Sequence, residues 1–80
     1  MNHQHHGPAV KALFVNEVDY LAYLGVYTSN IVRYVKNVKN IANEDLAIAL
    51  NISLEEEEEL ERTAAPLSEQ WRLKLRGFFS

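Results

Sequence analysis

Apolar side chains recur at the spacing of an α-helix over the whole stretch from residue 13 to residue 38. At about 100° per residue, most of its bulky apolar residues fall on one arc of a helical wheel, with asparagine, lysine and arginine opposite. Strict alternation is not sustained over any long window, which argues against a strand. We therefore predict one long amphipathic helix around which the rest of the chain is arranged. The alternative is two helices that break between Gly25 and Asn30, because glycine inside a helix costs about 1 kcal/mol relative to alanine.

The four tyrosines of the chain lie at the edge of this apolar arc. Tyrosine suits half-buried positions, either at the boundary of the protein's own core or at a surface that meets a partner. A continuous helix over residues 13–38 would be roughly 39 Å long, whereas a compact domain of this size is about 30 Å across. We therefore expect a second copy to cover the overhang, giving a homo-oligomer with a dimer favoured. The predicted interaction face on this helix consists of Tyr20, Tyr23, Tyr27, Ile31 and Tyr34.

The length and the residue types present exclude several classes of protein. A chain of 80 residues corresponds to one domain, and we assign residues 1–8 to a disordered or tag-like leader and residues 9–80 to a single helical domain. There is no cysteine and no glycine-rich phosphate loop, and the histidines lie only in the leader. We therefore predict no enzyme, no catalytic residue, no cofactor and no metal ion. Without an apolar run of about 18 residues or a signal peptide, we expect a cytoplasmic protein with no membrane partner.

The second half of the chain carries the start and stop signals of two short helices. Asn43 is predicted to cap a helix over residues 44–50, and Asn51 to end it in the left-handed conformation. Ser53 and Glu56 form the spacing of a capping box, which predicts a second helix over residues 54–64 with its glutamates solvated. Residues 70–79 fit both a helical face and the alternation of a strand. We favour the helix, and with it an all-α fold: a long helix, a two-helix corner and a C-terminal apolar-basic segment.

The predicted corner at residues 43–64 resembles a helix–turn–helix motif in its first helix and turn, from Asp45 to Ser53. In that motif the residue at position 57 packs inward and is aliphatic, and the second helix enters the major groove. Here the second helix carries five consecutive glutamates from Glu55 to Glu59, which a duplex with one negative charge about every 1.7 Å would repel. A DNA-binding transcriptional regulator is therefore our alternative rather than our leading hypothesis, and nucleic acid is disfavoured as a partner.

Charge is unevenly distributed along the chain. Residues 43–61 contain eight acidic side chains and no basic one, while both flanking segments are net basic. This block is interpreted as a solvated helix face, as a docking surface for a basic partner, or as a mimic of nucleic-acid charge that would make the protein an acidic inhibitor of a nucleic-acid-binding protein. We expect the C-terminal cations to pair with the glutamates of the same or a neighbouring chain. The predicted charged interaction residues are Glu55, Glu56, Glu57, Glu58, Glu59, Arg72, Lys74 and Arg76.

These observations lead to one functional hypothesis. The chain is expected to be a small non-enzymatic interaction or regulatory module that self-associates through its long helix and accommodates a protein partner with a basic surface.

Overall fold

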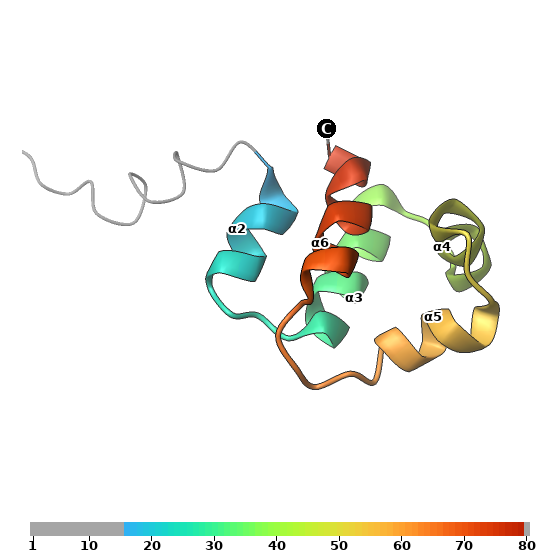
Figure 1. Ribbon diagram of the computed structural model, residues 1–80. Helices are drawn as coiled ribbons and strands as arrows, with labels where there is room; N and C mark the ends of the chain where they lie inside the picture. The colour runs from blue at the N-terminus through green and yellow to red at the C-terminus, as the bar shows by residue number, and fades with distance from the viewer. Residues whose placement is uncertain (1–15, 80) are drawn as a thin grey trace, which may run out of the picture.

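The computed structural model describes residues 16–79, and this part of the chain is all-α (Figure 1). The elements are α2 (Glu17–Tyr23), α3 (Thr28–Lys39), α4 (Asn43–Leu50), α5 (Leu54–Leu60), α6 (Glu69–Leu75) and a short 3-10 helix, η1 (Arg76–Phe79). Within these residues the only β-type pairing is an isolated bridge between Tyr27 and Pro66. The predicted all-α fold and the helical C-terminal segment are confirmed, whereas the predicted leader lies outside the described residues.

The prediction of one continuous helix over residues 13–38 is wrong. The described part of that stretch forms α2 and α3, separated by a turn at Gly25, and the longer of the two has 12 residues. Gly25 has a φ of 77°, in the left-handed region that glycine adopts without steric cost. Because the chain turns here, neither α2 nor α3 is long enough to overhang the domain, and a second copy is no longer required to cover a long helix.

The start of α3 is held by a distant segment of the chain. The first amides of a helix have no partner within the helix, and here the amide of Thr28 donates to the carbonyl of Ala65 at 2.8 Å and that of Ser29 to Thr63 at 3.1 Å. The Thr28 hydroxyl also donates to Ala65 at 2.8 Å. Residues 63–65 must leave the helical path to present these carbonyls, which explains why α5 ends at Leu60 rather than at the predicted residue 64.

Helix caps follow the sequence signals at most positions. The side chain of Asn16 accepts from the amides of Val18 and Asp19, while Ser53 and Ser68 cap α5 and α6. Asn51 ends α4 with a φ of 61°, as predicted. The predicted cap at Asn43 is off by one residue, because Ala42 occupies the cap position and Asn43 begins α4.

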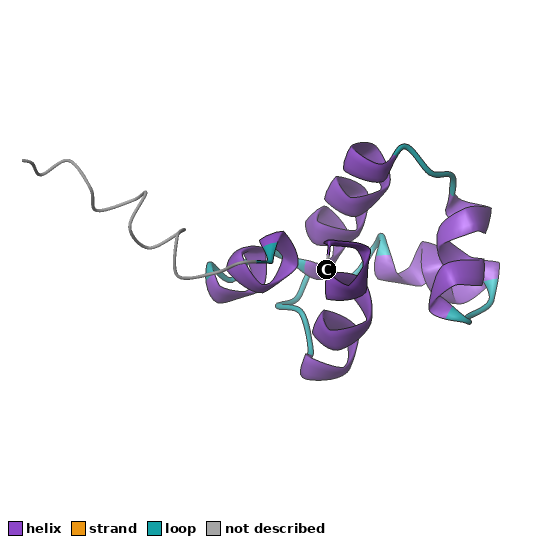
Figure 2. Cartoon of the chain, turned by 90° about the horizontal axis from the view of Figure 1, so that it is seen from above, coloured by secondary structure: helices purple, strands orange, loops and turns teal. Residues whose placement is uncertain are grey.

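The core lies between two groups of helices. Helix α2 packs beside α6 and η1 and also touches α3, while α4 and α5 pack mainly against each other and form a corner (Figures 1 and 2). Helix α3 connects the two groups, since it contacts both α2 and α5. The buried apolar cluster contains Val18, Ile31, Val32, Val35, Leu46, Leu50, Leu60 and Leu75.

Candidate functional site

Helix α5 carries the acidic run and begins with a complete capping box. The amide of Glu56 donates to the Ser53 hydroxyl at 3.0 Å, and the amide of Ser53 donates back to the Glu56 carboxylate at 3.1 Å. The glutamates are therefore positioned by a rigid helix start rather than by a loop. Four of the five are exposed, and we call this set the acidic face: Glu55, Glu56, Glu58 and Glu59.

Glu57, by contrast, is completely buried, so the expectation that all five glutamates are solvated is wrong. The helix–turn–helix pattern indicated the correct direction, because it places position 57 inward. Neither carboxylate oxygen of Glu57 receives a hydrogen bond from a donor. Burial first, and then the adjacent Glu61 carboxylate, raise the pKa of Glu57 to about 7. When Glu57 is protonated, its own O–H can donate to Glu61, which accounts for the apparent lack of a partner.

Glu61 connects Glu57 to a lysine on α3. The Lys36 ammonium lies 2.8 Å from the Glu61 carboxylate, and it also donates to the side chain of Asn43. Burial raises the pKa of Glu61, but hydrogen bonds from Glu57 and Lys36 outweigh it, and the net pKa is lowered. The group is thus a chain of one neutralisable acid, one ionised acid and one lysine at the junction of α3, α4 and α5.

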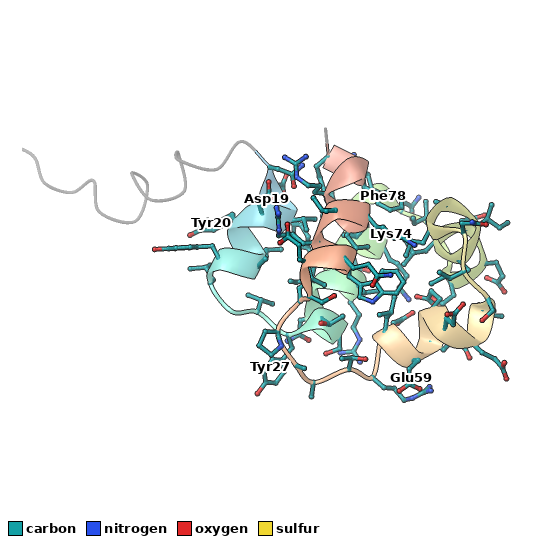
Figure 3. All side chains as sticks on the ribbon, in the orientation of Figure 1. Asp19, Tyr20, Tyr27, Glu59, Lys74 and Phe78 are labelled. Atoms are coloured by element: carbon teal, nitrogen blue, oxygen red, sulfur yellow. The ribbon has the colours of Figure 1, made fainter. Side chains whose placement is uncertain are left out.

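The expected pairing of the C-terminal cations with the glutamate run is largely wrong. Arg72 and Arg76 both bind Asp19 of α2, at 2.5 and 3.0 Å, and Arg72 also binds Glu69. Figure 3 shows Asp19 and Lys74 on opposite sides of α6. The ammonium of Lys74 lies 5.0 Å from the centroid of the Trp71 ring. Arg72 and Arg76 therefore stabilise the packing of α6 against α2, whereas Lys74 contacts Trp71 of its own helix. Within residues 16–79, none of these three cations forms an ion pair with a glutamate of α5.

The acidic face is consequently left with little counter-charge. Within residues 16–79 its one ion pair joins Glu59 to Arg62 at 2.9 Å, and both side chains of that pair are about two-thirds exposed, at 70% and 65%. An exposed pair of this kind contributes only about 0–1 kcal/mol. The face is therefore a concentrated negative surface that internal contacts do not neutralise.

A pocket of about 410 Å³ opens beside the acidic face. It lies between α5, the linker of residues 61–68, and the starts of α3 and α6. Its walls are Thr28, Glu56, Glu59, Leu60, Thr63, Pro66, Ser68 and Trp71. The sequence did not indicate this pocket, because its walls come from segments up to 43 positions apart and no local pattern links them.

The predicted tyrosine face is divided between different environments. Ile31 is fully buried in the core. Tyr34 is half-buried, donates its hydroxyl to Glu17 and stacks on Phe79 with the ring centroids 6.1 Å apart. Tyr20 is also half-buried, whereas Tyr23 and Tyr27 are 63% and 49% exposed near the turn that follows α2. The structure thus does not present the five residues as one surface, and an interaction role for them stays a prediction.

Other kinds of site find no support in the part of the chain that the structure describes. No three acidic, histidine or cysteine side chains of residues 16–79 come together in a group that could hold a metal ion. None of the helices formed by these residues has the length and apolar character needed to span a membrane. Comparison of the chain with protein-family models, with curated proteins and with solved structures finds no match. The acidic face and the pocket beside it are therefore the features of the described residues that can support a functional proposal.

Proposed function

We propose that this protein is a small non-enzymatic interaction module that binds a basic segment of a partner protein through the acidic face of α5. The observation that carries the proposal is the distribution of ion pairs. The arginines of α6 and η1 bind Asp19 and Glu69, and Lys74 lies on the Trp71 ring, so these cations do not neutralise the exposed glutamates of α5. Clustered charge of one sign increases the rate at which an oppositely charged partner associates, and it discriminates against partners of like charge.

The same charge argues against the DNA-binding alternative. The α4–α5 corner exists, but its second helix presents carboxylates where a helix–turn–helix protein presents side chains to base edges. Phosphates would be repelled by this surface. An acidic inhibitor of a nucleic-acid-binding protein, in contrast, is one form of the proposed function, because such a target has a basic surface of its own.

A peptide-binding measurement tests the proposal. We expect a fluorescently labelled oligolysine peptide to bind the protein at low salt. Its affinity should fall as salt is added, because exposed charges are screened over about 10 Å at 0.1 M. Glutamine at all four positions of the acidic face should weaken binding by about tenfold or more. The control variant, Glu44→Gln with Asp45→Asn, removes exposed charge from α4 and should change affinity by about twofold or less.

Two results would contradict the proposal. One is an affinity for the peptide that the four glutamine substitutions leave unchanged. The other is tight, salt-dependent binding of non-specific duplex DNA, which would restore the DNA-binding alternative.

Self-association is a second hypothesis, now limited to a smaller surface. Tyr23, Leu24 and Tyr27 are each about half exposed or more, at 63%, 53% and 49%, and they lie around the turn at Gly25. Exposed apolar side chains that cluster in this way can form a contact between copies. The mass of the protein in solution, measured by light scattering for the wild type and for Tyr27→Ala, tests this hypothesis.

A further inference from the structure

The pocket beside α5 combines an apolar interior with carboxylates. We call it the Trp71 pocket. Trp71, Leu60 and Pro66 provide the apolar wall, while Glu56 and Glu59 come from the acidic face. These two glutamates are three positions apart on one helix, which places them on the same side of α5. The volume of the Trp71 pocket, about 410 Å³, is within the range of small-ligand sites, which is about 300–1,000 Å³.

This combination is complementary to a long cationic side chain. The aliphatic stem of such a side chain can lie on Leu60 and Pro66 while its charged end reaches the carboxylates. The Trp71 ring already lies near one cation, the ammonium of Lys74. Glu59 is available to a second cation because its present partner, Arg62, is exposed and held by a weak pair.

We propose that the Trp71 pocket receives one arginine side chain from the basic segment of the partner, so that this arginine anchors the segment on the acidic face. The inference rests on the proposed function and adds the chemistry of the anchor. Arginine fits better than lysine for two reasons. Its planar guanidinium stacks on an aromatic ring, and its forked donors can bind two carboxylate oxygens at once. Lysine offers a compact point charge and gains less from either feature.

Trp71 is the only tryptophan of the chain, so its fluorescence reports directly on the pocket. The experiment titrates the 80-residue chain with a short blocked peptide that has one arginine flanked by lysines, and with an all-lysine peptide of equal length and charge. We expect the arginine peptide to change the Trp71 emission saturably and to bind about fivefold or more tightly than the all-lysine peptide.

Two double variants separate the pocket from the general charge of the helix. Glu56→Gln with Glu59→Gln removes the carboxylates of the pocket, and glutamine at position 56 can still complete the capping box. Glu55→Gln with Glu58→Gln removes equal charge from residues of the same helix that do not line the pocket. The first variant should bind the arginine peptide about tenfold more weakly than the wild type, and the second about threefold more weakly or less.

The outcomes distinguish the two proposals. If neither peptide binds the wild-type protein, the proposed function and the arginine anchor both fail. A second outcome combines three results: both peptides bind with equal affinity, both double variants lower that affinity equally, and Trp71 emission does not change. In that case the acidic face binds basic peptides but the pocket does not anchor arginine. Trp71→Leu provides an independent check with labelled peptide, since it should remove the arginine preference while circular dichroism shows that the helices remain.

Discussion

The buried carboxyl of Glu57 should make the stability of the folded protein depend on pH. Burial beside Glu61 raises the pKa of Glu57 from an ordinary value of 4.5 to about 7 in the folded protein. Between these values the folded state binds this proton and the unfolded state does not, so the free energy of unfolding falls as pH rises. The stability that the protonated Glu57 contributes is fully present below about pH 4.5 and is lost above about pH 7. At about 1.4 kcal/mol for each pH unit between the two pKa values, the loss is at most about 3–4 kcal/mol.

The variant Glu57→Gln isolates this effect. Glutamine is close in shape, stays neutral, and can donate its amide N–H to Glu61 as protonated Glu57 does. We expect the variant to match the wild type within about 1 kcal/mol at pH 5. At pH 9 it should be more stable by about 2–3 kcal/mol. In a domain of this size that difference raises the unfolding midpoint by about 10 °C or more.

The assay is urea denaturation followed by Trp71 fluorescence and circular dichroism between pH 5 and pH 9. Glu61 does not confuse the result, because its pKa is lowered and its contribution is lost only as pH falls below about 4.5. Glu55→Gln, an exposed change on the same helix, should follow the wild type in parallel. Equal pH dependence in Glu57→Gln and the wild type would refute the reasoning.

Two further predictions concern the packing of α2. Gly25 has a φ of 77°, and a Cβ there would meet no atom within 4 Å, so Gly25→Ala should lower the free energy of unfolding by about 1–2 kcal/mol through backbone strain alone. Urea denaturation measures this loss. Gly25→Asn is the matched comparison and should lose less, because asparagine adopts the left-handed conformation more readily than alanine. Asp19 binds both Arg72 and Arg76 with its side chain only 17% exposed, so Asp19→Asn should lower the thermal midpoint by about 5 °C. Glu69→Gln, at an exposed partner of Arg72, should lower it less; an equal effect of the two would show that the α2–α6 contact does not depend on Asp19.

Local features of this fold could be predicted without a structure. Helix starts at Ser53 and Ser68 and the helix end at Asn51 were predictable, because a cap depends on residues only a few positions away. The acidic run on α5 was equally visible. The break at Gly25 was identified as an alternative, but the periodicity on both sides favoured the wrong choice. A helical wheel records the direction of side chains and cannot show that the axis has turned between them.

What the sequence alone determined was local: the helix starts at Ser53 and Ser68, the helix end at Asn51, and one strongly acidic helix. Only the tertiary structure decided which charges are neutralised, because Asp19 meets Arg72 and Arg76 across 53 and 57 positions. It likewise decided that Glu57 is buried and that α5 ends at Leu60, where the chain turns to bond the first amides of α3. Each of these features requires two segments that are remote in sequence to be in contact, and the pattern of either segment by itself does not specify that contact.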